Sequence, residues 1–155
     1  MKILIDADDA ALDLKEEIIN HLQSGGFDVQ DLCFGSESTL EAEPCYPDIA
    51  YNLAVKIQAG EAHRGILLCG TGIGMAITAN KVKGVYACTA HDTYSAQRLR
   101  KSNDANVLTM GSRVVGIELA KCIVDDWLSS EFAGGGSTYK VSRIRALEAE
   151  SFDTA

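Results

Sequence analysis

The sequence is short of basic residues, of long apolar runs and of paired cysteines. Lysine and arginine total 14 against 22 aspartates and glutamates, which gives a net charge of −8. Nucleic-acid binding needs a basic face, so no nucleic-acid partner is expected. No apolar stretch reaches the roughly 20 residues that span a bilayer. The N-terminus runs into KILI without the apolar core and cleavage site of a signal peptide. We therefore expect a cytoplasmic protein with no membrane partner.

The five cysteines are odd in number and widely spaced, and none forms a CxxC pair. This pattern argues against a disulfide framework and against a structural zinc site. The cysteines are expected to be reduced thiols, and a functional one has to be identified by its surroundings.

Short apolar runs alternate with longer amphipathic segments. The runs read as strands are 2–5, 28–33, 65–69, 84–89 and 106–110. Helical spacing or helix-end residues mark six further segments, which are 11–26, 47–60, 74–81, 93–102, 116–130 and 137–150. This alternation predicts an α/β fold, a Rossmann-like doubly wound five-stranded parallel sheet in a three-layer αβα sandwich. The length favours one domain over residues 1–155. Ligands of such folds bind beyond the carboxyl ends of the strands.

A glycine-rich loop, GTGIG at residues 70–74, follows the third expected strand. Met75 replaces the third glycine of a dinucleotide fingerprint, and the Gly-Lys-Ser/Thr end of a nucleotide P-loop is missing. Neither cofactor is expected. The loop's N–H groups can still converge on one point, where the start of the next helix adds positive charge. Such a nest can hold a phosphate or a developing oxyanion.

Cys69 comes immediately before this loop. Beside a helix N-terminus the thiolate form is favoured, and a thiolate next to oxyanion donors suits removal of a proton alpha to a carbonyl. The alternative is that Cys69 is a small core residue at the end of a buried strand. The residues alone leave both interpretations open.

Four stretches together resemble a known family. They are KILIDADDAALDLK (2–15), YPDIA (46–50), CGTGIGMAITANKVKG (69–84) and HDTYSAQRLRKSNDANVLTMGSRVVGIELAK (91–121). In unbroken order over nearly the whole chain, they resemble the type B ribose-5-phosphate isomerases and their galactose-6-phosphate isomerase relatives, of which this chain is a divergent member. The resemblance implies aldose–ketose interconversion of a sugar phosphate through a cis-enediolate, without a metal or other cofactor.

The resemblance also assigns catalytic roles. Cys69 is the base that moves the proton between C1 and C2, and Thr71 assists proton handling at the substrate oxygens. The amides of Gly70, Gly72 and Gly74 hold the enediolate.

Further residues are implied to bind substrate. Asp8 and Asn103 contact its hydroxyls, Tyr46 lines the pocket and Arg113 binds the phosphate. Members of the family are dimeric with the site completed by the neighbouring subunit. A homodimer or dimer of dimers with shared sites is therefore implied, with the helix of 115–130 and the C-terminal helix of 137–150 at the interface.

The chain departs from the family's pattern at residues that the resemblance places near the substrate. Asp9 stands in place of a histidine, and Ser102 replaces the histidine thought to open the sugar ring. GGGS at 134–137 replaces Gly-Gly-Arg-His, and Lys140 aligns with an arginine. His91, after the fourth strand, is either a substitute acid or a capping or surface histidine. We count Asp9, His91, Ser102 and Lys140 with the substrate-binding residues.

Three accounts of these departures are open. A four-carbon sugar phosphate needs no ring opening, and tetrulose-phosphate isomerases that resemble this family carry a similar serine. Ribose 5-phosphate is the second substrate, with His91, Lys140, Arg143 or Arg145 compensating for the lost groups, and a six-carbon sugar is a further variant. In the third account the chain is a catalytically inactive sugar-phosphate-binding subunit.

A rival function comes from the first strand. ILIDADDAA also resembles the opening of haloacid-dehalogenase-like phosphatases, in which Asp6 and Asp8 have the spacing of nucleophile and acid and could bind Mg²⁺ with Asp9. Against this, Ala10 replaces the usual Thr or Val, and the later acidic pair at 125–126 lies in a helical pattern. We therefore prefer the isomerase.

Overall fold

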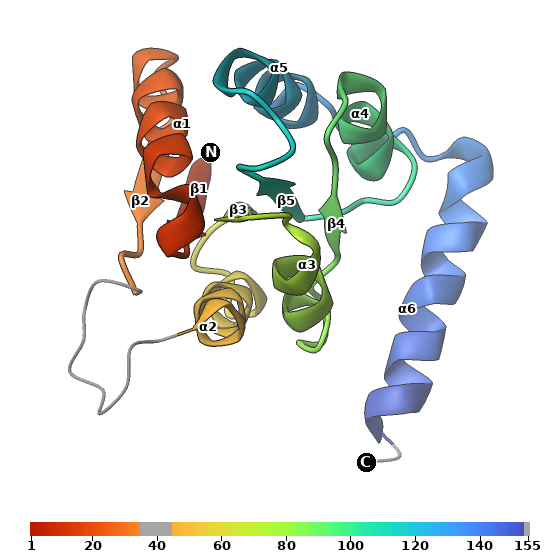
Figure 1. The fold of residues 1–155 in the computed structure, drawn as a ribbon. Coiled ribbons are helices and arrows are strands. Elements are labelled where there is room, and N and C mark those ends of the chain that lie inside the picture. Colours follow the sequence, from red (N-terminus) through yellow and green to blue (C-terminus); the bar gives the residue numbers. More distant parts are fainter. Residues whose placement is uncertain (35–44, 154–155) are drawn as a thin grey trace.

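Five parallel strands form one sheet in the order β2-β1-β3-β5-β4, as Figure 1 shows. The structure, a computed structural model, describes residues 1–34 and 45–153. The strands are β1 (Lys2–Ala7), β2 (Asp28–Asp31), β3 (Arg64–Cys69), β4 (Ala87–Thr89) and β5 (Val107–Gly111). The central strands β1, β3 and β5 are buried on both faces, as expected for a parallel sheet covered on both sides.

Helices cover both faces of this sheet. Their bounds are α1 (Leu12–Ser24), α2 (Tyr46–Gln58), α3 (Ile73–Ala79), α4 (Thr93–Lys101), α5 (Ile117–Leu128) and α6 (Thr138–Asp153), with short 3-10 turns η1 (Asp9–Ala11) and η2 (Gly135–Ser137). In Figure 1, α1, α4 and α5 lie on one face, and α2 and α3 lie on the other. The predicted three-layer αβα sandwich is confirmed.

Alternating side chains of each strand fill two separate cores. Ile66 and Leu68 of β3 join the core under α1, α4 and α5, which contains the fully buried Trp127. Leu67 and Cys69 point to the opposite face and join the core under α2 and α3. This period-2 alternation decides which layer each β3 side chain enters, and it puts the Cys69 side chain on the α2/α3 side.

The expected strands and helices are all present, with shifted ends. β4 begins at Ala87 rather than at residue 84, because residues 82–85 form a turn in which Val85 N–H bonds Val82 O and Gly84 has φ +80°. The segment GSESTLEAEPCY (35–46), whose composition predicts a long polar connection, lies outside the described residues except for its last two residues. That residues 1–155 fold as one domain stays a prediction.

α6 runs beside the β4 edge and projects away from the layers (Figure 1). Glu148 fixes its middle by accepting hydrogen bonds of 2.9 Å from Gly84 N–H and from the Tyr86 hydroxyl. Arg145 pairs with Asp104 at 2.6 Å. None of the helices in the described part of the chain has the length and apolar character that crossing a bilayer would require.

Candidate active site

Backbone hydrogen bonds gather three loops at the carboxyl end of β3. Asp8 N–H, after β1, donates to Leu68 O at 3.2 Å. After β5, Ser112 N–H donates to Cys69 O at 2.8 Å, and Arg113 N–H donates to Gly70 O at 3.1 Å. The predicted residues Asp8, Cys69 and Arg113 therefore share one edge of the sheet.

Cys69 lies in the core, and its sulfur also meets a main-chain hydrogen-bond donor. It is 6% exposed and packs in the core under α2 and α3. Its Sγ accepts a hydrogen bond of 3.0 Å from Gly72 N–H. The two interpretations left open by the sequence are thus compatible, because a side chain in the core wall can still present one sulfur lone pair to a main-chain donor.

Two glycines let the 70–74 loop lie directly on β5. Gly72 has φ +76°, and a Cβ there would stand 2.9 Å from the Met110 backbone. A Cβ on Gly111 would stand 2.5 Å from the Thr71 Cα. Contacts this short with backbone cannot be relieved by turning a side chain. Gly72 is therefore required for both its conformation and its close approach.

The other two loop glycines make room for predicted site residues. A Cβ on Gly74 would lie 2.4 Å from the ring of Tyr46, which is 43% exposed at the start of α2. A Cβ on Gly70 would lie 3.3 Å from the Arg113 guanidinium. The loop surface thus carries an aromatic ring at one end and a fixed positive charge at the other.

The loop after β1 adds carboxylates beside that charge. Burial raises the pKa of Asp8, and nearby Asp9 raises it further, whereas the Ala10 N–H and Arg113 lower it. Asp8 Oδ1 accepts the Ala10 N–H at 3.1 Å and caps η1. Asp9 and Arg113 both line a cleft between the first turns of α1 and α5. Two carboxylates and one guanidinium therefore face solvent at this edge.

His91 joins the ends of β4 and β5. Its Nε2 accepts a hydrogen bond of 2.8 Å from Gly111 N–H. An imidazole nitrogen that accepts a hydrogen bond carries no proton of its own. In the neutral ring the proton is therefore on Nδ1. The predicted use of His91 as an acid remains a prediction, and through Nε2 it would require breaking the bond to Gly111.

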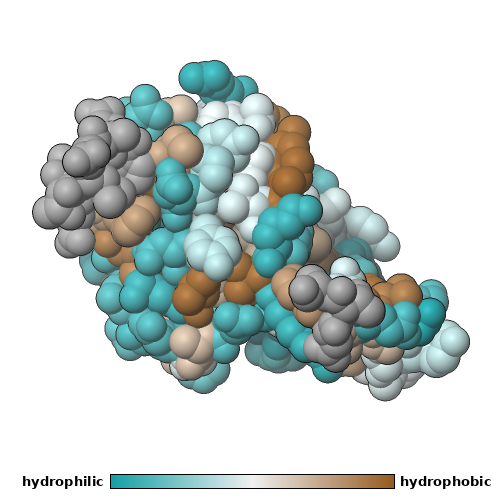
Figure 2. Space-filling model, turned by 90° about the horizontal axis from the view of Figure 1, so that it is seen from below, coloured by the Kyte–Doolittle hydropathy of each residue, from teal (hydrophilic) through white to brown (hydrophobic). Residues whose placement is uncertain are grey.

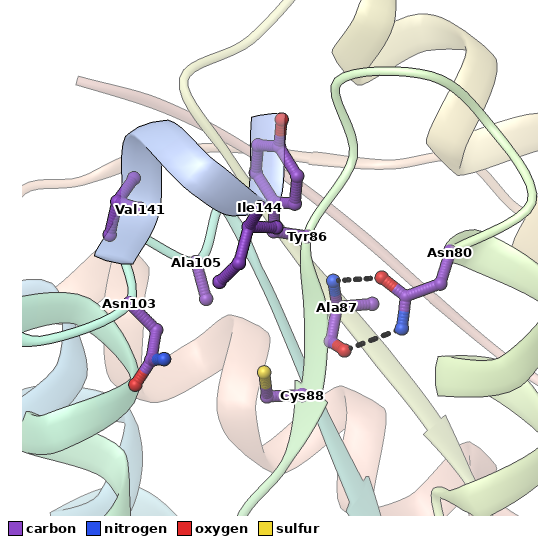
Figure 3. A pocket seen from close by; sticks show the side chains of 8 residues that line it. All are labelled: Asn80, Tyr86, Ala87, Cys88, Asn103, Ala105, Val141 and Ile144. Atoms are coloured by element: carbon purple, nitrogen blue, oxygen red, sulfur yellow. Dashed lines mark hydrogen bonds between the residues drawn. The ribbon is translucent and has the colours of Figure 1, made fainter. Parts of the chain in front are cut away.

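Ser102, Asn103 and Lys140 lie away from Cys69. α4 begins after the carboxyl end of β4 and runs back along the sheet, so Ser102 and Asn103 come at the opposite edge, before β5. Ser102 accepts a hydrogen bond from Arg98. Asn103 lines a pocket of about 190 Å³ between α6 and β4, shown in Figure 3. Lys140 is exposed on α6. One chain does not bring these three residues to the sulfur.

The fold also bears on the phosphatase interpretation. Asp6 is fully buried and accepts N–H groups from Ala7 at 2.9 Å and Phe34 at 3.2 Å, so its oxygens face main chain. Asp125 and Asp126 lie within α5, not after a strand. No group of three or more His, Cys, Asp and Glu side chains is arranged for a metal ion within 1–34 and 45–153. The spacing of Asp6 and Asp8 thus does not make both available at one site.

Sequence reasoning missed Thr89 and Thr109, whose hydroxyls meet beneath the glycine loop at an Oγ1–Oγ1 distance of 2.7 Å. The available signal was a hydroxyl inside an otherwise apolar strand, VLTMG. A buried hydroxyl needs a hydrogen-bond partner, so such a position points to a polar contact.

Known proteins match this chain over almost its full length. Residues 3–144 match the Ribose/Galactose Isomerase family. A D-erythrulose-4-phosphate isomerase of Pectobacterium atrosepticum is 56% identical over 148 residues, covering 96% of this chain and 95% of the relative. The ribose-5-phosphate isomerase B of Escherichia coli is 44% identical over 147 residues, covering 95% and 96%. The solved ribose-5-phosphate isomerase B of Clostridium thermocellum superimposes with a TM-score of 0.88 at 40% identity, covering 97% of this chain and 99% of that one. The chain therefore belongs to the ribose/galactose isomerase family.

Proposed function

We propose that this aldose–ketose isomerase acts on a four-carbon sugar phosphate and that Cys69 is its base. Ser102 is the observation that supports a four-carbon substrate. It stands where ribose-type members carry the histidine thought to open the sugar ring. A tetrose 4-phosphate has its terminal oxygen phosphorylated, so it cannot close a five-membered ring and needs no ring opening. The 56% identical relative is named for erythrulose 4-phosphate, which supports the same choice.

The reaction proposed for the sulfur is a proton relay between neighbouring carbons. The Cys69 thiolate takes the proton from the carbon alpha to the carbonyl, and the electron pair moves into a cis-enediolate. The resulting thiol returns the proton to the adjacent carbon, while a hydroxyl proton moves between the two oxygens. Thr71, next to the sulfur in the loop, is proposed to handle that second proton. No metal or cofactor is needed for this balance.

Binding of the phosphate is assigned to Arg113, with Asp8 and Tyr46 on the sugar. Arg113 lies on Gly70, one residue from the sulfur, which places a guanidinium within reach of a short substrate. Asp9 lines the same cleft as Arg113, and its carboxylate is suited to a sugar hydroxyl rather than to the phosphate. Gly70 and Gly74 are the amides proposed to share the enediolate charge, because Gly72 N–H is directed at the sulfur.

We further propose that Ser102, Asn103 and Lys140 complete the site of a second copy of the chain. They are remote from Cys69 in their own chain, yet the resemblance assigns them to the substrate. Figure 2, which views the molecule from the α2/α3 side, shows apolar surface among polar residues. Large apolar side chains that stand exposed on α2, α3 and α6 include Tyr51, Ile73, Ile77, Ile144 and Leu147. Exposed apolar area of this kind is typical of interfaces. That α5 and α6 lie at this interface, and that the protein is cytoplasmic, remain predictions.

Substrate choice is tested by comparing kcat/KM for erythrulose 4-phosphate, ribose 5-phosphate and galactose 6-phosphate. The four-carbon ketose should be preferred by at least about tenfold, or ~1.4 kcal/mol of transition-state binding. Ser102→His should shift the ratio toward ribose 5-phosphate. If the wild-type protein preferred ribose 5-phosphate, the proposal of a four-carbon substrate would be wrong and the five-carbon sugar would take its place. Turnover and deuterium exchange absent with all three would favour the inactive binding subunit.

The base is tested with Cys69→Ala and with Cys122→Ala as a matched control at an exposed cysteine. Cys69→Ala should abolish turnover and solvent-deuterium incorporation at C1 and C2 while substrate binding by calorimetry persists. Cys122→Ala should keep both. A Cys69→Ala variant with normal kcat would exclude the sulfur as base.

The shared site is tested by mixing two inactive variants, Cys69→Ala and Asn103→Ala. Random exchange of subunits makes half of the dimers hybrids, and each hybrid has one intact site, so about a quarter of wild-type activity should return. If each site were built within one chain, the mixture would stay inactive.

A further inference from the structure

Two threonine hydroxyls form a polar contact beneath the glycine loop. Thr89 ends β4, and it pairs in register with Thr109 of β5. Their Oγ1 atoms are 2.7 Å apart, and Thr89 Oγ1 donates to Gly72 O at 3.3 Å. Thr109 is fully buried. These contacts connect two rigid strands to the peptide next to the one that meets the Cys69 sulfur.

The direction of these hydrogen bonds follows from counting protons. A threonine hydroxyl has one proton to donate. Thr89 gives its proton to Gly72 O, so the bond between the two hydroxyls must be donated by Thr109. The hydrogen bonds therefore run in one direction, from Thr109 to Thr89 to Gly72. Hydrogen bonds aligned in this way polarise one another and strengthen the last acceptor contact.

Gly72 is consequently held on both of its sides. Its carbonyl accepts from Thr89 and also from Ala76 N–H at 3.1 Å, the first hydrogen bond of α3. Its N–H donates to Cys69 Sγ at 3.0 Å. Gly72 has φ +76°, and as a glycine it has no side chain whose packing could fix this conformation. Removing the contact to Thr89 would leave the Ala76 N–H as the partner of the Gly72 carbonyl among the described residues.

We propose that Thr89 and Thr109 are positioning residues that hold Gly72 N–H against the Cys69 sulfur. The partners of the two hydroxyls are each other and Gly72 O. Their effect on turnover rests on the proposed role of Cys69 as base, whereas their effect on the sulfur's reactivity does not. The hydroxyl pair holds the loop against β5 through Gly72 O, and with it the main-chain N–H that donates to the Cys69 sulfur.

Valine substitutions separate positioning from stability. Thr89→Val leaves the buried Thr109 hydroxyl without an acceptor, which destabilises the fold. The double variant Thr89→Val/Thr109→Val removes both hydroxyls at nearly constant shape, so its stability should return toward wild type. Its Gly72 contact stays lost. Thr89→Ser keeps the hydroxyl, and Thr78→Val makes the same change on α3 without touching the pair.

The expected result has two readouts. In both Thr89→Val variants, kcat should fall roughly 3- to 10-fold with KM within about twofold, as for loss of one hydrogen bond that acts on chemistry. The rate at which iodoacetamide alkylates Cys69, followed by peptide mass spectrometry as a profile over pH, should change in the same variants, because the N–H that meets the sulfur is no longer held in place. Thr89→Ser should restore both readouts, and Thr78→Val should match wild type.

Two outcomes would overturn the proposal, and a third would overturn the function on which its effect on turnover rests. If kcat recovers together with stability in the double variant, the pair is only structural. If Thr89→Val behaves like Thr78→Val in both readouts, the pair does not act on the sulfur. If Cys69→Ala itself keeps turnover, the proposed function fails instead, and the alkylation profile alone then decides the threonine proposal.

Discussion

The buried carboxyl of Asp6 should make the folded state less stable as the pH rises. Asp6 is 0% exposed, and burial raises its pKa from 3.8 to about 6. The N–H groups of Ala7 and Phe34 and the ammonium of Lys15, 3.9 Å away, oppose that rise, and Asp31 adds to it. Lys15 bonds Asp31 at 2.9 Å, so its charge is shared. Burial therefore outweighs the favourable contacts.

The sign follows from proton binding. Between pH 3.8 and about 6 the folded state holds a proton that the unfolded chain has released. Stability is then fully present below the unfolded pKa and falls as the pH rises through the folded pKa. A shift from 3.8 to about 6 corresponds to a loss of about 3 kcal/mol across this window. Asp6→Asn does not titrate and keeps one oxygen to accept a main-chain N–H, so its stability should lack this fall.

Urea unfolding between pH 3.5 and 7.5, followed by the fluorescence of the single, fully buried Trp127, measures the difference. Protein concentration must be constant, because association also stabilises the folded state. Wild type should lose roughly 2.4 kcal/mol relative to Asp6→Asn between pH 4 and 7, which is most of the full change. Asp28→Asn, which removes an exposed carboxylate from β2, should run parallel to wild type. Parallel curves for wild type and Asp6→Asn would refute the argument, since they would mean that the folded state binds no extra proton at Asp6.

The remaining predictions concern the loop and α6. Gly72→Ala should yield little folded protein in circular dichroism, because its Cβ would meet the β5 backbone at 2.9 Å with φ +76°. Gly74→Ala should keep the stability of the fold or raise it by up to ~1 kcal/mol, because the atoms nearest its Cβ belong to the movable ring of Tyr46. The same variant should lower kcat/KM about as much as Tyr46→Ala does, because the displaced ring no longer lines the site. An additive effect in the Tyr46/Gly74 double variant would contradict that coupling. Glu148→Ala should raise amide hydrogen exchange across 138–153, because it removes the acceptor of the Tyr86 hydroxyl; unchanged exchange would show that other contacts hold α6.

The sheet and the position of the loop were predictable because both depend on local pattern. Apolar runs of strand length, separated by amphipathic segments, require a covered parallel sheet, and ligand loops of such sheets follow the strands. Asp8, Cys69 and Arg113 each follow or end a strand, so one rule brings all three to the same edge. The edge of the sheet that holds the site was therefore predictable, whereas the distances between these residues come from the structure.

What the sequence left out depends on contacts between distant segments. Nothing local says that Gly74 faces Tyr46, 28 positions earlier, or that His91 accepts from Gly111. The length of α4 decides that Asn103 returns to the opposite edge, although it lies only 12 residues after His91. Thr89 and Thr109 were hidden for the same reason, since their partnership exists only once β4 and β5 are adjacent.

Charge at the carboxyl edge gives the physical reason for the proposed second copy. Asp8, Asp9 and Arg113 together carry a net charge near −1 when both carboxylates are ionised. A phosphate ester adds about −1.5 to −2. Arg113 must then neutralise the phosphate while it also offsets Asp8, whose pKa it lowers. Lys15, the ammonium near the ends of β1 and β2, is buried against Asp6 and Asp31, whereas Lys140 stands exposed on α6. A subunit that brings Lys140 to the phosphate and Asn103 to the hydroxyls would add positive charge at this edge, so that Arg113 would not have to offset both the phosphate and Asp8.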